Sequence, residues 1–244
     1  MNPTFSVIVG AYKHSKTIGK LAEALNQQTH QGFEIHLCDD GSPDGTKEIF
    51  ESKLHPLLKK RYFYHRQEQK GMRLARNINQ GISAATGDYC IFIMGDSFPD
   101  PEYLEVFNRY TQPHRILCGV RYQVDRDVGV DIDFRLKKQM IPPANVLLPS
   151  LPFNEITGNG LCVPTQAMRD HGMWNEALQG YGGDDTELVG RLYYKGYTVW
   201  SLADAKLFHH WHKSTESRNI PLVTKLVEQY AGVYELNQEH AGKL

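Results

Sequence analysis

The sequence predicts an α/β fold in which a mostly parallel central sheet lies between two layers of helices. The first observation behind this prediction is the alternation of short apolar runs with amphipathic segments through the first half of the chain, which is typical of strand–helix–strand units. The second is that the apolar runs are continuous, as in strands that are buried on both faces. The third is the length of 244 residues, which is enough for one large α/β domain.

The elements of the first half follow one another in order. Strands are predicted at "FSVIV", "FEIHLCDD", "YFYHR" and "YCIFIM". A helix with Ile18, Leu21 and Leu25 on its apolar side follows the first strand, and "RLARNINQGISAA" predicts another helix before the fourth strand. A further helix is expected in "DPEYLEVFNRY", with Asp100 as its N-cap and Pro101 in its first turn.

The second half of the chain is less regular. "ILCGVRYQV" predicts a strand, "QMIPPANVLLPSLPFNEITGNG" a loop, and "YTVWSLADAKLFHHWH" a mixture of strand and loop. A helix over residues 185–195 should bury Leu188, Val189 and Leu192, and an amphipathic helix should begin near Pro221. No change of composition marks a linker, so we expect a single domain over residues 1–244.

Charge and cysteine content exclude several classes of protein. The 27 basic and 28 acidic residues balance, which gives no electrostatic reason to expect a nucleic acid partner. The cysteines are widely spaced among apolar neighbours, as buried thiols of a reducing compartment would be: Cys38, Cys90, Cys118 and Cys162. The N-terminus lacks a signal-peptide pattern, and no apolar run approaches the roughly 18 residues that span a bilayer. We therefore expect a cytoplasmic protein.

Chemically capable side chains follow three of the predicted strands. Tyr12 follows the first strand, Asp39 and Asp40 end the second, and Asp96 follows the fourth. Ligands of open parallel sheets bind beyond the carboxyl ends of the strands. A carboxylate there can accept a hydrogen bond from a nucleotide base or ribose, and Tyr12 can stack on the base. A turn capped by an acid explains the Asp39–Asp40 pair about equally well at this point.

The segment "GYGGDDTELVGRL" places two adjacent acids at the start of a predicted helix. Gly182 and Gly183 allow the backbone to turn tightly in front of Asp184 and Asp185. Helix capping would account for one of these acids. If both face a cleft, their repulsion should raise at least one pKa, which suits a general base.

The segment "KLFHHWHKS" contains His209 and His212, three residues apart. Together with Asp96 they could form an open site for a divalent cation, whose remaining ligands would be phosphates and water. The alternative is that these are structural histidines of a loop. A closed zinc site is disfavoured because the cysteines are too scattered to contribute.

Two arginines of "KGMRLARN" share one face of a predicted helix. Arg73 and Arg76 could form a solvated helix face or could bind a diphosphate.

Three segments occur in an order that resembles glycosyltransferase family 2, a family of inverting enzymes with the GT-A fold, a Rossmann-like three-layer sandwich. They are "FSVIVGAYKHSKTIGKLAEALNQQTHQGFEIHLCDDGSPDGT", "ARNINQGISAATGDYCIFIMGDS" and "WNEALQGYGGDDTELVGRLYYKG". The third segment, followed by "HHWH", is most similar to the branch with galactosyltransferase-like and chondroitin-polymerase-type domains. The resemblance implies a UDP-sugar donor and Mn²⁺ or Mg²⁺ as cofactor.

The resemblance also implies roles for individual residues. Tyr12 would lie against the uracil base, and Asp39 would bind its N–H. Asp185 would be the catalytic base that deprotonates the acceptor. The implied nucleotide-binding residues are Ala11, Tyr12, Asp39, Asp40, Arg73, Arg76 and Gly95. The implied metal ligands are Asp96, His209 and His212, and the implied acceptor-binding residues are Asp184, Tyr181 and Trp174.

Residues 1–110 would then form the nucleotide-sugar half, residues 111–215 the acceptor half, and residues 216–244 a C-terminal helix. The acceptor would be a glycan or a lipid-linked saccharide at the inner face of the membrane. The C-terminal helix would either contact the membrane or a partner protein, or simply pack on the core. A sugar nucleotidyltransferase is disfavoured because "GAYKHSKT" is not a Gly- and Arg-rich phosphate loop, and a non-catalytic carbohydrate-binding domain is the second alternative.

Two positions depart from the family pattern. Met94 stands where the first acid of an Asp-x-Asp motif is expected, and Gly10 stands where proline is usual. The missing acid usually contacts ribose, or the metal through water, so we expect altered donor affinity or metal dependence. We interpret Gly10 as neutral.

Overall fold

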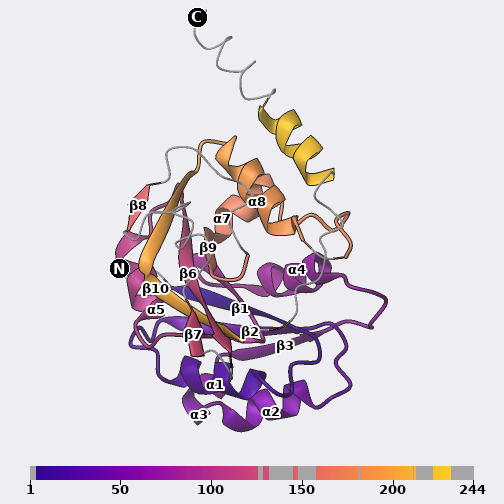
Figure 1. Cartoon of the computed structure of the whole chain (residues 1–244), viewed down its shortest axis with the longest axis vertical. Helices are drawn as coiled ribbons and strands as arrows, with labels where there is room; N and C mark the ends of the chain where they lie inside the picture. Colours follow the sequence, from indigo (N-terminus) through magenta and orange to yellow (C-terminus); the bar gives the residue numbers. More distant parts are fainter. Residues whose placement is uncertain are drawn as a thin grey trace, which may run out of the picture.

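The computed structural model describes residues 4–125, 129–131, 145–147, 158–180, 182–210, 212 and 222–231. A mixed sheet runs through the middle of the molecule, with helices above and below it (Figure 1). Its strands are β1 Phe5–Ala11, β2 Phe33–Asp39, β3 Tyr62–Arg66, β4 Tyr89–Met94, β5 Ser97–Pro99, β6 Arg115–Asp125, β7 Gly129–Asp131, β8 Val146–Leu147, β9 Leu161–Pro164 and β10 Thr198–His210. The helices are α1 Ile18–Asn26, α2 Thr46–Lys53, α3 Pro56–Lys59, α4 Leu74–Ala84, α5 Tyr103–Tyr110, α7 Thr165–His171, α8 Asp184–Tyr193 and one over residues 222–231.

The long strands are parallel and the short ones are antiparallel. The strand order is β3-β2-β1-β4-β9-β6-β10-β5. β3, β2, β1 and β4 are mutually parallel, as are β6 and β10, whereas β9 lies antiparallel between β4 and β6. The carboxyl ends of β1, β2 and β4 therefore meet at one edge of the sheet, where the sequence predicted the ligand site.

Each face of the sheet has its own apolar core. Val7 and Val9 of β1 belong to the cluster beneath α1, α2 and α5, whereas Ile8 belongs to the cluster beneath α4, α7 and α8. Because successive side chains of a strand point to opposite faces, a run of continuous apolar residues is what such a doubly covered strand requires. The predicted three-layer α/β architecture is thus confirmed.

Two predicted elements differ in their bounds. α5 begins at Tyr103, with Glu102 rather than Asp100 at the N-cap position. The Asp100 carboxylate instead accepts a hydrogen bond from the backbone N–H of Glu102 at 3.2 Å, closing a turn that precedes the helix. The predicted strand and loop after residue 197 form one 13-residue strand, β10. Within the predicted loop over residues 139–159, only residues 145–147 and 158–159 are described.

An irregularity in β10 sets the position of its last residues. Leu202 pairs with Gly119 of β6, but Lys206 already pairs with Val120, so residues 203–205 have no partner on β6. The shift brings His209 opposite Gln123. Since the insertion is odd, it also exchanges the two faces of the strand, and Ala205 and Leu207 join the same core cluster as Leu202.

The helix over residues 222–231 packs on the body of the protein. Val223 and Val227 are buried against Leu178, and Tyr194 packs beside them. The Tyr230 hydroxyl donates to Glu187 Oε1 of α8 at 2.6 Å. The apolar side of this helix is therefore used within the molecule, and in the described part of the chain no helix has the length and apolarity to cross a bilayer.

A partly buried chain of polar side chains links β2 and β3. Glu34 Oε1 lies 2.9 Å from His36 Nε2, and His36 Nδ1 lies 3.0 Å from His65 Nε2. The Glu34 carboxylate can only accept, so a neutral His36 donates from Nε2 and accepts from His65 at Nδ1. Burial lowers the pKa of His65, and the neighbouring His36 lowers it further.

This arrangement predicts a stability that falls on acidification. Because the pKa of His65 is lower in the folded protein than its unfolded value of about 6.5, the unfolded chain binds more protons below that pH. We expect a lower melting temperature at pH 5 than at pH 7.5, and a smaller difference in His65→Gln, whose Nε2 can replace the imidazole donor but does not titrate. An equal pH dependence in both proteins would contradict this.

Candidate active site

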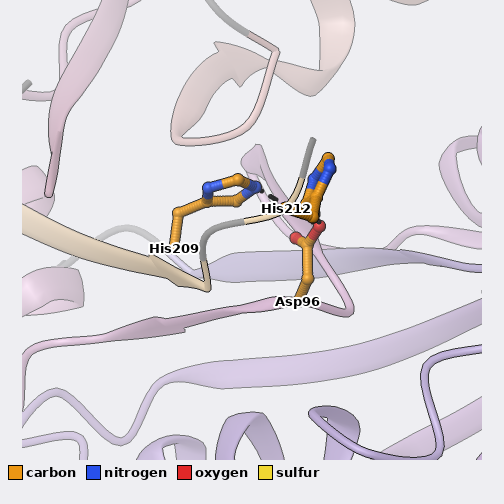
Figure 2. A group of neighbouring side chains, drawn as sticks. All are labelled: Asp96, His209 and His212. Carbon is orange, nitrogen blue, oxygen red and sulfur yellow. Dashed lines mark ion pairs between the residues drawn. The ribbon is translucent and has the colours of Figure 1, made fainter. Parts of the chain in front are cut away.

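Asp96, His209 and His212 converge although more than one hundred residues separate the acid from the histidines. Asp96 follows β4, His209 lies at the end of β10, and His212 follows it. His209 Nε2 and His212 Nε2 each lie 3.3 Å from Asp96 Oδ2. Both imidazoles point toward the carboxylate (Figure 2). The backbone N–H of His210 also donates to the Asp96 carbonyl at 2.9 Å, which fixes the end of β10 against this turn.

The Asp96 carboxylate is held in its ionised form. Burial opposes ionisation, but the hydrogen bonds to His209 and His212 outweigh it and hold the Asp96 pKa well below its ordinary range. His209 is oriented from its other side, where Nδ1 lies 2.8 Å from the Gln123 amide oxygen. With a cation bound, a proton on Nδ1 would donate to Gln123 and leave the Nε2 lone pair free to bind the cation.

This group of atoms fits a divalent cation. One ligand atom from each residue lies within 4.8 Å of the others. Two cis ligands on a cation with bonds of about 2.1 Å are about 3 Å apart, close to the separations seen here. Carboxylate suits hard ions such as Mg²⁺, whereas imidazole suits softer ions, so two histidines make this set less suited to Mg²⁺. The His209 side chain is 10% exposed and that of His212 is 51% exposed, so His209 is the better-fixed ligand.

A cavity of about 600 Å³ opens beside this group. Tyr12, His14, Asp44, Asp96 and His212 are among the residues that line it. Burial lowers the pKa of His14, and the Asp96 charge partly offsets this effect. His14 was not among the residues predicted from the sequence, although its position two residues beyond Tyr12 was a usable signal.

The two acids at the start of α8 both have raised pKa values. Asp185 Oδ2 accepts from the Gly158 N–H at 2.6 Å, and Oδ1 accepts from the Thr186 N–H at 2.7 Å. Burial, together with the Asp185 charge, raises the pKa of Asp184 to about 7. Burial also raises the pKa of Asp185, but its backbone donors oppose this. The adjacency of two acids in the sequence suggested a raised pKa for at least one of them, and the Asp184 shift has this direction.

Two predicted nucleotide-binding acids differ in how they are engaged. Asp39 uses both carboxylate oxygens, accepting from Ser42 N–H at 2.9 Å and from the Tyr64 hydroxyl at 2.8 Å. Asp40 Oδ1 accepts from the Gln67 amide at 2.7 Å, and within the described residues no hydrogen bond occupies its Oδ2. The turn-capping alternative thus describes Asp39 better than Asp40.

Backbone hydrogen bonds and close packing fix the residues that follow β1 and β4. Ala11 is buried and its carbonyl accepts from the Asp40 N–H at 2.9 Å. The Gly95 N–H donates to the Gly10 carbonyl at 2.9 Å. A side chain at Gly95 would collide with the His14 ring, so glycine is required there.

Other predicted residues lie away from this cavity. Arg73 and Arg76 line a second cavity of about 700 Å³ along the outer side of α4, together with Arg66 and Lys70. Trp174 is buried, packs edge-on against Phe92 and lies under Gly158, so it supports the turn that holds Asp185. Tyr181 lies outside the described residues.

Comparisons with known proteins identify the family of this chain. The family model described as "Glycosyl transferase family 2" matches residues 6–164. EpsE of Bacillus subtilis (strain 168), which is named as a glycosyltransferase, is 30% identical over 223 residues, covering 83% of this chain and 71% of that protein. Chondroitin synthase of Escherichia coli is 25% identical over 240 residues, covering 84% of this chain and 34% of that protein.

A crystal structure of S. aureus TarS 1–349 in complex with UDP has a TM-score of 0.69 at 18% identity, covering 93% of this chain and 65% of that one. This likeness bears on the fold alone, and it confirms the predicted GT-A-type architecture. The chain spans about a third of chondroitin synthase and just under two thirds of the TarS fragment. The extent of the family match and the similarity to EpsE show that this chain belongs to glycosyltransferase family 2 and is a glycosyltransferase.

Proposed function

We propose that the protein is an inverting, Mn²⁺-dependent enzyme that transfers a sugar from a UDP-sugar to a hydroxyl of a glycan or lipid-linked acceptor. The observation that carries the proposal is the joint placement of an Asp–His–His group and of two adjacent acids at the start of α8. Residues 158 and 159 hydrogen-bond to the two sides of this arrangement. The TarS fragment, which shares the fold, was crystallised with UDP.

The donor would lie in the cavity beside Tyr12 and Asp96. Tyr12 is partly exposed at the end of β1, where its ring can stack on a base. We assign the base N–H to Asp40 rather than to Asp39, because Asp40 keeps an oxygen that no described residue engages. Asp39 would instead hold the turn that follows β2.

Asp96, His209 and His212 would hold the cation. When bound, it would supply positive charge that offsets the charge developing on the UDP leaving group. The supports of Asp96 and His209 are already in place, since Ser97 Oγ donates to Asp96 Oδ1 at 3.1 Å and Gln123 engages His209.

Asp185 would act as the base. Its two backbone donors favour the ionised form, whereas Asp184 more readily keeps the proton that the pair shares near neutral pH. Asp185 takes the proton of the acceptor hydroxyl while that oxygen bonds to the anomeric carbon. The bond from this carbon to UDP breaks on the opposite side, so the configuration inverts.

A panel of UDP-sugars and saccharide acceptors, incubated with Mn²⁺ and assayed for UDP release, tests the proposal. Acceptor-dependent release of UDP is expected with at least one donor. Thermal stabilisation by UDP without any turnover would favour the non-catalytic binding domain. Release of pyrophosphate from sugar phosphate and nucleoside triphosphate would favour the nucleotidyltransferase.

Tyr12→Ala should weaken UDP binding by about 5- to 150-fold, because stacking on an aromatic ring is worth about 1–3 kcal/mol. Tyr12→Phe keeps the ring and serves as the control, with an affinity close to that of the wild type. Isothermal titration of UDP in the presence of Mn²⁺ measures the difference. Equal affinities in the Ala and Phe variants would remove Tyr12 from the donor site.

A further inference from the structure

The turn over residues 158–160 is fixed to both sides of the proposed site. The Gly158 N–H donates to Asp185 Oδ2 at 2.6 Å. The Gly160 N–H donates to the Phe92 carbonyl of β4 at 2.8 Å, and the Gly160 carbonyl accepts from the Gly119 N–H of β6 at 2.9 Å. The backbone of this turn therefore has little freedom relative to the sheet, and the residue between the two glycines has a defined place.

That residue, Asn159, turns its side chain toward the cation site. Its Oδ1 accepts from the Met94 N–H at 3.1 Å, and its Nδ2 donates to Ser97 Oγ at 2.7 Å. Ser97 Oγ in turn donates to Asp96 Oδ1 at 3.1 Å. The Met94 N–H can only donate, so it fixes the orientation of the amide, and the direction of every bond in the chain follows.

This series of hydrogen bonds is buried at its centre. Asn159 is 8% exposed and Ser97 is 1% exposed. The two groups that the Asn159 amide contacts, Met94 N–H and Ser97 Oγ, flank the Gly95–Asp96 turn. One side chain therefore holds both ends of the turn that carries the Asp96 carboxylate. Oδ1 of Asp96 is thereby occupied, which leaves Oδ2 to face His209 and His212.

We propose that Asn159 is a positioning residue that holds the cation-binding carboxylate of Asp96 at a fixed place relative to the base Asp185. This inference rests on the proposed function. One tripeptide would then fix the distance between the two groups, because Gly158 holds the base Asp185 and Asn159 holds the cation ligand Asp96 through Ser97. A fixed distance matters because catalytic groups must be held within about 0.5 Å of their productive geometry.

Mn²⁺ affinity, measured by electron paramagnetic resonance of the free ion, tests the inference without relying on turnover. Asn159→Leu keeps the approximate volume but removes both hydrogen bonds, and should weaken Mn²⁺ binding by about 10- to 100-fold. Ser97→Ala is a smaller change that should also weaken it. Because the two residues act in series, the double variant should bind Mn²⁺ no more weakly than Asn159→Leu alone.

Gln28→Met provides the matched control. Gln28 is also buried, and its amide makes hydrogen bonds of 3.2, 2.8 and 3.1 Å to Ala24 O, Asp100 O and Leu104 N. Its removal should lower the melting temperature about as much as Asn159→Leu, with unchanged Mn²⁺ affinity. An Asn159→Leu protein whose Mn²⁺ affinity matches that of Gln28→Met would show that the amide only stabilises the fold, and the inference would be overturned.

Failure of the proposed function has a different signature. A wild-type protein that binds no Mn²⁺ would overturn both the cation site and the role of Asn159. A wild type that binds Mn²⁺, with affinity unchanged in Ser97→Ala, Asn159→Leu and the double variant, would overturn the role of Asn159 alone. At saturating Mn²⁺, we also expect a lower kcat in Asn159→Leu, with little change in the KM for the UDP-sugar.

Discussion

Asp185→Asn is expected to lower kcat by about 10²- to 10⁴-fold, the range by which a positioned general base accelerates a reaction. The amide keeps the size of the side chain and one oxygen for the Gly158 N–H, but its NH₂ faces the Thr186 N–H, so UDP affinity should change little while the melting temperature falls. The expected loss is therefore in the chemical step. Initial rates of UDP release at saturating donor and acceptor measure it, with UDP titration as the test of intact donor binding.

Asp170→Asn, on the exposed side of α7, is the matched control and should retain wild-type rates. If Asp185→Asn transfers sugar at close to the wild-type rate, Asp185 is not the base. Asp184→Asn then becomes the decisive variant, because the pKa of about 7 for Asp184 would allow it to exchange a proton near neutral pH.

The second large effect is expected at Asp96. Asp96→Asn removes the charge that both histidines face, and should abolish measurable Mn²⁺ binding and Mn²⁺-dependent transfer. The loss should exceed the 10- to 100-fold typical of residues that merely support a ligand. His209→Ala should be more damaging than His212→Ala, because the His209 side chain is largely buried and held by Gln123 while that of His212 is about half exposed.

His114→Ala, an exposed histidine outside this group, is the control for loss of an imidazole. Chelation of the wild type should reproduce the effect of Asp96→Asn, and added Mn²⁺ should restore only the wild type. Undiminished transfer in chelator would remove the cation from the mechanism. A greater loss in His212→Ala than in His209→Ala would reverse the assignment of the principal imidazole ligand.

The layers of the fold were predictable because they depend on local patterns. Continuous apolar runs identified β1, β2 and β4, and the 3.6-residue period identified α1, α4 and α8. The start of α5 was not predictable from Asp100 and Pro101, because an acid followed by proline suits a turn as well as a helix N-terminus. The β10 irregularity depends on pairing with β6, which no pattern within residues 198–210 specifies.

Residues of the candidate site that belong to a sequence motif were predictable. Residues whose position depends on which strands pair, and in which register, were not. Motif order brought together Asp96, His209 and His212 across the chain. The engagement of Asp39 by Tyr64 depends on β3 lying beside β2, and the positions of Gln123 and Asn159 depend on strand register and on a turn held by three separate segments. Such residues carry no signal in the sequence, because asparagine and glutamine are unremarkable in a loop or a strand end.

The two departures from the family pattern become one feature in the structure. Gly10 and Met94 are direct partners on the neighbouring strands β1 and β4. A Cβ atom on residue 10 would lie 3.0 Å from Met94 Sδ, so the absent side chain at one position makes room for the thioether at the other. Gly10 is therefore matched to Met94, whereas the sequence alone suggested that it was neutral.

The buried cysteines can serve as probes of local unfolding in the sheet. Cys38, Cys90, Cys118 and Cys162 lie in β2, β4, β6 and β9, one to a strand. Burial raises the pKa of Cys38 and of Cys90 to about 12, so neither is a thiolate at neutral pH in the closed state. A thiol reagent reacts only when a strand is exposed to solvent. In variants that keep one cysteine at a time, the rate of thiol modification would therefore measure how often β2, β4, β6 or β9 becomes exposed to solvent.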